Sequence, residues 1–145
     1  MIGHITRNPI IDCALIAWFL AQLCKVVLTA LMERRWDLRL LTASGGMPSS
    51  HSACVMACTA SLGKLHGFTG PMFAVAAVLS AIVMYDACNV RRSAGDTARL
   101  VNKLLAHVEK TSAQELADDL KIIMGHTPLQ VLAGAVMGLV IGLMA

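Results

Sequence analysis

The chain has 145 residues, of which 57% are hydrophobic and only 14% are charged. An average soluble protein has roughly 25% charged residues, so this chain has too little polar surface to cover a water-facing globule. Its formal net charge is only +3 and 4% of its residues are aromatic, which argues against a nucleic-acid partner. The composition therefore excludes an ordinary soluble enzyme and favours an all-α membrane protein in contact with membrane lipids.

Four apolar segments approach or exceed the roughly 20 residues that a bilayer span needs. Proline suits the first turn of the second and third segments, at Pro48 and Pro71, and Thr127 with Pro128 suits the N-cap and first position of the fourth. We therefore expect a single domain, 1–145, with about four transmembrane helices. These four helices are predicted at residues 9–32, 48–63, 71–90 and 127–144.

The segment 91–125 is the only long polar stretch, and its apolar residues recur at the spacing of short amphipathic helices. Of the 12 Lys and Arg residues, nine lie on one side of the predicted spans, two lie on the other, and Lys25 lies within the first. The positive-inside rule then places 91–125 in the cytoplasm and both termini outside. The expected location is a bacterial inner membrane or an organelle membrane.

Two segments stand out from the apolar background: GGMPSSHSA at 45–53 and GHTPLQVLAG at 125–134. They place His51 and His126 at the cytoplasmic starts of two helices, where backbone N–H groups and the helix dipole favour an anion. Phosphate is the expected anion. The further residues predicted to bind it are Lys25, Gly46, Ser49, Ser50, Arg91 and Arg92.

Several of these polar residues also have structural interpretations. Arg91 and Arg92 suit interfacial anchors as well as phosphate ligands. Lys25 lies about two turns inside the first span, so it needs a partner or a polar cavity unless its side chain snorkels to the interface. Asp86 is a candidate to pair with Lys25 or an arginine, to orient a histidine, or to bind a metal.

The last predicted span and the cysteines carry two further patterns. Gly134, Gly138 and Gly142 share one helix face, which suits either close packing inside the bundle or the seam of a homo-oligomer. The five cysteines are scattered through apolar runs, and none completes a set of metal ligands. No metal and no other cofactor is expected.

The chain resembles the compact divergent branch of the type-2 phosphatidic acid phosphatase family. The resemblance rests on AWFLAQLCK at 17–25, on IVMYDACNVRRSAG at 82–95, and on the two histidine segments. PSSH at 48–51 is similar to the P-S-G-H motif of the main family. HTPLQVLAG at 126–134 is similar to the segment H-x-P-x-D-V-x-A-G, which carries that family's nucleophilic histidine.

The resemblance implies a metal-independent lipid phosphatase that works through a phosphohistidine at the cytoplasmic interface. His126 would attack phosphorus, His51 would protonate the leaving oxygen, and Gln130 would stand where the family usually has an acid that orients the nucleophile. Phosphatidic acid, phosphatidylglycerol phosphate and polyprenyl pyrophosphates all suit such a site. The alternative is a non-catalytic lipid-phosphate-binding or scaffold protein, which the neutral Gln130 favours.

Overall fold

The computed structural model of the chain describes residues 6–34, 36, 41, 46–89, 97, 100–101 and 126–144. Within these ranges the secondary structure is helical, and no strand occurs. The prediction of an all-α protein is therefore confirmed. The long helices are α1 (Pro9–Glu33), α2 (Ser50–His66), α3 (Pro71–Cys88) and α6 (Pro128–Met144).

Two of the helices are long and apolar enough to cross a bilayer, namely Pro9–Met32 of α1 and the whole of α3. Helix α6 is apolar but has only 17 residues, and α2 has the same length. A helix of 17 residues is about 25 Å long, slightly less than the roughly 30 Å of a hydrocarbon core. The predicted segment 91–125 lies outside the described residues, apart from Thr97, Leu100 and Val101, which are helical.

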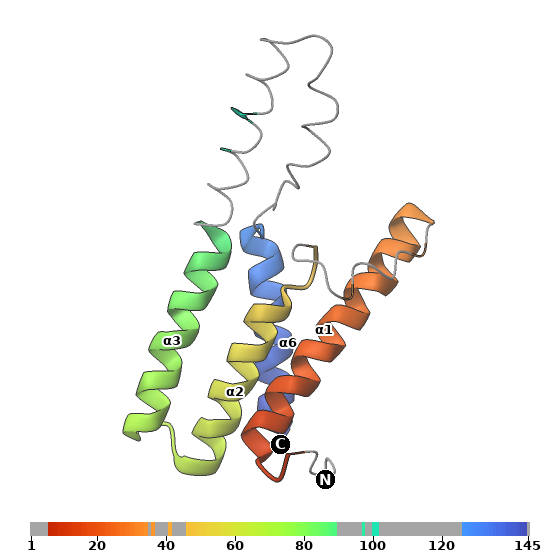
Figure 1. Cartoon of the computed structure of the whole chain (residues 1–145). Coiled ribbons are helices and arrows are strands. Elements are labelled where there is room, and N and C mark those ends of the chain that lie inside the picture. The colour runs from red at the N-terminus through yellow and green to blue at the C-terminus, as the bar shows by residue number, and fades with distance from the viewer. Residues whose placement is uncertain are drawn as a thin grey trace.

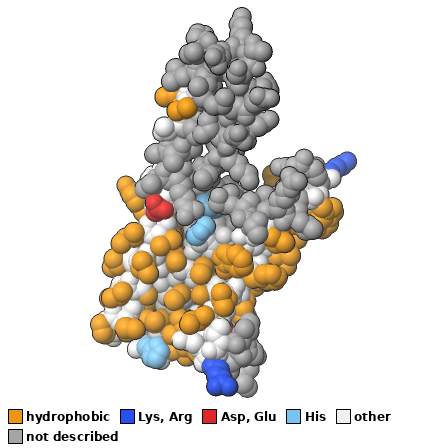
Figure 2. Space-filling model, viewed as in Figure 1, with side chains coloured by type: hydrophobic (Ala, Val, Ile, Leu, Met, Phe, Trp, Pro, Cys, Tyr) orange, Lys and Arg blue, Asp and Glu red, His pale blue; other side chains and the backbone are white. Residues whose placement is uncertain are grey.

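Helix α2 is the centre of the bundle, because it contacts α1, α3 and α6. Figure 1 shows α1 and α3 on opposite sides of α2, with consecutive helices running in opposite directions. The ends of α1 and α3 and the starts of α2 and α6 consequently lie at one end of the bundle. Figure 2 shows hydrophobic side chains over most of the helical bundle that is coloured in this view, as expected for a surface that faces lipid.

The face of α6 that carries its glycines packs directly on the backbone of α2. A Cβ atom added at any of these three glycines would overlap a carbonyl oxygen of α2, so only glycine permits this approach. The three glycines therefore pack within the chain. The homo-oligomer that their spacing also suggested stays a prediction. The overlapping pairs are Gly134 with Ser49, Gly138 with Ala53, and Gly142 with Ala57.

Helices α2 and α3 are joined by buried hydroxyl groups. The Oγ1 of Thr59 and the Oγ of Ser80 lie 2.7 Å apart. The Thr59 hydroxyl also lies 3.2 Å from the carbonyl oxygen of Ala76, and the Ser80 hydroxyl lies 3.1 Å from that of Val55. The two hydroxyl protons can therefore form two of these three hydrogen bonds at a time. Interhelical hydrogen bonds of this kind stabilise membrane helix pairs by roughly 0.6–2 kcal/mol each.

The start of α2 differs from the prediction that Pro48 occupies its first turn. The helix begins at Ser50, and the side chain of Ser49 caps it by accepting a hydrogen bond from the backbone of Ser52 at 3.4 Å. Pro48 thus lies before the cap. A serine oxygen can satisfy a helix-start N–H group, which proline cannot do, and this displaces the boundary by two residues.

The end of α2 also lies beyond residue 63, where the predicted span ends. Gly63 is buried in the helix, where a Cβ atom would lie 2.5 Å from the ring of Phe68, and the helix continues to His66. It ends at Gly67, whose φ of 93° is readily adopted only by glycine. Gly63 therefore provides space for an aromatic ring and does not terminate the helix.

We predict that Gly138→Ala lowers the stability of the protein, because the added methyl group would meet backbone and could be accommodated only by separating α2 from α6. The expected loss is about 1–3 kcal/mol, the usual cost of overpacking. Thermal unfolding in detergent micelles measures it. Gly70→Ala is the matched control, because its Cβ would meet only ordinary contacts of 3.6 Å. Equal stability of the two variants would contradict the close α2–α6 seam.

Candidate functional site

Two backbone hydrogen bonds join the helix termini at one end of the bundle. The N–H of Ser49 donates to the carbonyl of Gln130 at 2.9 Å, which connects the starts of α2 and α6. The N–H of His126 donates to the carbonyl of Ala87 at 3.1 Å, which connects the start of α6 to the end of α3. These bonds fix the relative positions of the two histidine segments.

The structure brings the two predicted histidines together. His51 lies in the first turn of α2, and His126 lies immediately before the cap of α6. Their ring centroids are 6.2 Å apart and the ring planes are inclined by 80°. His126 is only 1% exposed, whereas His51 is partly exposed. Two imidazoles therefore lie close together at two helix starts.

Lys25 is buried in the bundle, with only 1% of its surface exposed. Its Nζ donates to the Oε1 of Gln22 at 2.7 Å, and Gln22 precedes it by three residues on the same face of α1. Its aliphatic stem lies against Gly46, where a Cβ atom would be 3.0 Å from the lysine Cγ. The ammonium group therefore points back toward the preceding turn of α1 and does not snorkel to the interface.

Three serines are buried at the start of α2. Ser49 and Ser52 are 0% exposed and Ser50 is 3% exposed. The hydroxyl of Ser52 donates to the Oγ of Ser49 at 3.0 Å, which also accepts the Ser52 N–H. Ser49 thus acts as a helix cap in this structure, while Ser50 adds a buried hydroxyl beside His51.

Gln130 forms a reciprocal cap with Thr127 at the start of α6. Its Oε1 accepts the N–H of Thr127 at 3.0 Å, and its own N–H donates to the Thr127 Oγ1 at 3.4 Å. This is the capping-box arrangement of a threonine followed three residues later by glutamine. The predicted N-cap is confirmed, and Gln130 has a structural role that the sequence analysis did not assign to it.

The remaining predicted site residues lie at the edge of the described region or outside it. Asp86 is in the last turn of α3, one residue before the carbonyl that accepts the His126 N–H. Arg91 and Arg92 lie outside the described residues. Among the residues that the structure does describe, no group of three or more His, Cys, Asp or Glu side chains is placed to hold a metal ion.

Gln22 and Asp12 are among the buried polar residues that the sequence analysis missed. Gln22 was detectable, because a polar residue three positions before an intramembrane lysine shares its helix face. Asp12 lies near the start of α1, at the other end of the bundle from the histidines, and is 2% exposed. Its Oδ1 accepts hydrogen bonds from the N–H and the hydroxyl of Thr6 at 2.8 and 2.7 Å, which gives it a local structural role.

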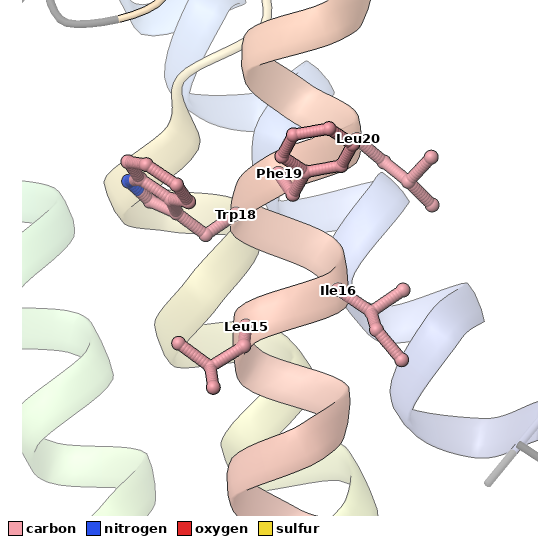
Figure 3. A pocket seen from close by; sticks show the side chains of 5 residues that line it. All are labelled: Leu15, Ile16, Trp18, Phe19 and Leu20. Atoms are coloured by element: carbon pink, nitrogen blue, oxygen red, sulfur yellow. The ribbon is translucent and has the colours of Figure 1, made fainter. Parts of the chain in front are cut away.

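A separate groove of about 330 Å³ lies on α1 (Figure 3). All of its lining side chains are apolar, so it suits hydrocarbon and offers nothing to bind a phosphate. No predicted phosphate ligand lines it. The lining residues are Leu15, Ile16, Trp18, Phe19 and Leu20.

We predict that Gln130→Ala lowers the stability of the protein by about 1 kcal/mol, because it removes the acceptor for the Thr127 N–H. Gln130→Glu should keep the stability, since a carboxylate fills the same place in a capping box and is favoured near a helix start. Thermal unfolding in micelles measures both. Leu129→Ala is the control, because Leu129 is 66% exposed and takes no part in the cap. A Gln130→Ala protein as stable as the wild type would show that the cap contributes nothing.

Comparison with known proteins identifies the family of the chain. The chain is 36% identical to the uncharacterized membrane protein YuiD of Bacillus subtilis (strain 168) over 149 residues, which cover 96% of this chain and 94% of that protein. No solved structure matches the chain. The model of the Divergent PAP2 family matches residues 6–141, which include both histidine segments and Lys25. The chain therefore belongs to the Divergent PAP2 family, as its resemblance to type-2 phosphatidic acid phosphatases predicted.

Proposed function

We propose that the protein is a membrane-embedded phosphatase that hydrolyses a lipid phosphomonoester or pyrophosphate through a phosphohistidine. The observation that carries this proposal is the pair of imidazoles, His51 and His126, 6.2 Å apart at two helix starts. Membership of the Divergent PAP2 family supports it. Helix starts favour anions, and paired imidazoles can provide both a nucleophile and an acid near neutral pH.

The proposed reaction has two steps. In the first, a ring nitrogen of His126 donates its lone pair to phosphorus, the bond from phosphorus to the ester or bridging oxygen breaks, and His51 gives that oxygen a proton. In the second, His51 takes a proton from water, the water oxygen attacks phosphorus, and the phosphorus–nitrogen bond breaks to release phosphate. Each histidine thus ends in its starting state.

The charge that develops on the phosphoryl oxygens needs fixed positive partners. Lys25 is held inside the bundle beside Gly46, and the start of α2 adds the positive end of its dipole. We propose that the remaining phosphate ligands are Ser49, Ser50, Arg91 and Arg92. The serine hydroxyls would donate hydrogen bonds to the phosphate, and each guanidinium group would bind two phosphate oxygens. Asp86, in the last turn of α3, lies at the end of the bundle that holds the two histidines. We propose that it orients one of them.

A membrane location favours a lipid as the source of the phosphate. The relative YuiD is a membrane protein, and two helices of this chain could span a bilayer. In the proposed arrangement all four long helices cross the membrane, the histidine end faces the cytoplasm, and both termini lie outside, as the distribution of Lys and Arg favours. The lipid headgroup then meets the site at the cytoplasmic interface.

One observation favours a second candidate, a protein that binds lipid phosphates without hydrolysing them. The side-chain oxygen of Gln130 accepts the Thr127 N–H, so that oxygen is engaged in a helix cap. A neutral amide also stabilises a cationic phosphohistidine less than a carboxylate does. Turnover by the purified protein separates the two candidates.

The test of the proposed function is phosphate release by the purified full-length protein from a panel of lipid phosphates. The panel contains phosphatidic acid, phosphatidylglycerol phosphate and a polyprenyl pyrophosphate, each with and without excess chelator. We expect release from at least one of them, unchanged by the chelator. Binding without release would favour the second candidate, and turnover that a divalent ion restores after chelation would contradict the metal-independent mechanism.

The same assay applied to two variants assigns the histidine roles. His126→Ala should abolish turnover, and His51→Ala should lower it by roughly 10²–10⁴-fold. The loss in His51→Ala should be smaller for a substrate with a good leaving group, because such a group needs no proton. Thr59→Val, which removes a buried hydroxyl remote from the histidines, is the control for general damage to the fold. Wild-type turnover in His126→Ala would overturn the mechanism.

The proposed orientation predicts which introduced cysteines an impermeant thiol reagent reaches in intact cells. Ile2→Cys should be labelled from outside, whereas Lys110→Cys should be labelled only after the membrane is permeabilised. The parent protein, with its five native cysteines, gives the background. Labelling of Lys110→Cys but not Ile2→Cys in intact cells would reverse the orientation.

A further inference from the structure

The contact between Gln22 and Lys25 is not used by the mechanism above, although both side chains are almost completely buried. Gln22 is 5% exposed and Lys25 is 1% exposed. An ammonium group at this depth is costly, and a lysine side chain is long enough to relieve the cost by extending toward the interface. Some interaction must therefore keep the Lys25 ammonium group inside the bundle.

The geometry around Lys25 shows one interaction that contributes to this. The amide oxygen of Gln22 accepts a hydrogen bond from the lysine Nζ at 2.7 Å, and Gln22 lies one turn closer to the start of α1. The acceptor thus draws the ammonium group away from the cytoplasmic end of the helix. Gly46 also lies against the lysine stem, where an added methyl group would be only 3.0 Å from the lysine Cγ and would have to displace the stem slightly.

The chemistry of Gln22 suits a lysine that must bind an anion. A carboxylate at this position would hold the ammonium group equally well, but it would neutralise the lysine and repel phosphate. An apolar residue would leave the charge available but would remove an acceptor that holds it. An amide combines a strong acceptor oxygen with no net charge.

We propose that Gln22 is a positioning residue that keeps the Lys25 ammonium group inside the bundle as a fixed, charged ligand for the phosphate group of the substrate. The inference rests on the proposed function in one respect, namely that Lys25 faces a phosphate. The position of the lysine itself is a separate property and can be measured without any substrate.

The first measurement is the rate at which a water-soluble amine-acylating reagent modifies Lys25 in the full-length protein in detergent, read by peptide mass spectrometry. Lys64, which is exposed, is the internal reference. We expect slow modification in the wild type and an increase of about fivefold or more in Gln22→Leu, because the released amine reaches the interface. Thr59→Val removes another buried polar group and should leave Lys25 protected. An unchanged Lys25 rate in Gln22→Leu would overturn the proposal.

The second measurement is the affinity for inorganic phosphate, determined by calorimetry on the same proteins. Gln22→Leu should weaken binding about three- to tenfold, the scale of one hydrogen bond to a charged group. Gln22→Glu should weaken it at least as much, although it keeps the acceptor and the fold. A purely structural glutamine would tolerate glutamate, so wild-type affinity in Gln22→Glu would overturn the proposal even if Gln22→Leu did not fold.

A double-mutant cycle shows whether Gln22 acts through Lys25. Lys25→Met alone should weaken phosphate binding, and adding Gln22→Leu to it should have no further effect. An equal effect of Gln22→Leu in both backgrounds, or no effect of Lys25→Met, would overturn the proposal. Turnover is scored separately. Coupled phosphate binding without turnover in the wild type would contradict the phosphatase and leave the role of Gln22 standing, whereas turnover with no Gln22–Lys25 coupling would do the reverse.

Discussion

The close approach of α6 to α2 is the constraint on which the rest of the structure depends. Three glycines, one per turn of α6, lie on carbonyl oxygens that recur once per turn of α2. This match sets both the distance between the helices and their register. The hydrogen bond from Ser49 to Gln130 continues the same seam by one turn at the cytoplasmic end in the proposed orientation. The spacing of the two histidine rings therefore follows from the packing of two backbones.

The central position of α2 explains its composition. Its buried residues are mostly alanine, serine and threonine, small side chains that let neighbouring helices approach from three sides. Helix α3 contrasts with it, because large apolar side chains such as Val75, Val78 and Ile82 are more than half exposed and suit contact with lipid. The chain thus places small and hydroxyl-bearing side chains on the central helix and exposed apolar bulk on α3.

Much of the fold could be predicted from the sequence, because helix length, apolar content and start signals are local properties. The four helices were expected near their observed positions, and Thr127 and Pro128 stand where the capping pattern put them. The glycine pattern was ambiguous, since spacing alone does not show which helix fills the groove. The two boundaries of the second span, at Pro48 and Gly63, were misplaced for a similar reason. Their roles depend on a neighbouring cap and a neighbouring ring that only the folded chain supplies.

The candidate site was predictable in its residue types but not in its contacts. Two histidines at helix starts and one lysine inside a span are visible in the sequence, because such residues are rare in apolar segments. The partners of Gln130 and Gln22 were not predicted. A glutamine side chain has both donors and acceptors, so many groups could pair with it. Only the folded structure shows that Gln130 pairs with the backbone of Thr127 and Gln22 with the ammonium group of Lys25. The motif of a family therefore locates its chemistry more reliably than it assigns each polar side chain.

In the proposed function, the buried lysine and the phosphate each offset the free-energy penalty of burying the other charge. Lys25 lies eight residues before the end of α1, which is about 12 Å of helix, and its side chain is buried in the bundle. Burying either a phosphate or a lysine alone is unfavourable, because the charge loses its water. When the two are buried together they attract each other strongly, because little water lies between them. In the empty site, the hydrogen bond to Gln22 offsets part of the desolvation penalty of the Lys25 ammonium group. In the occupied site, the phosphate offsets more of it. A lipid whose phosphate binds beside Lys25 therefore stabilises the helical bundle. After the product is released, the Lys25 ammonium group still has its hydrogen bond to Gln22.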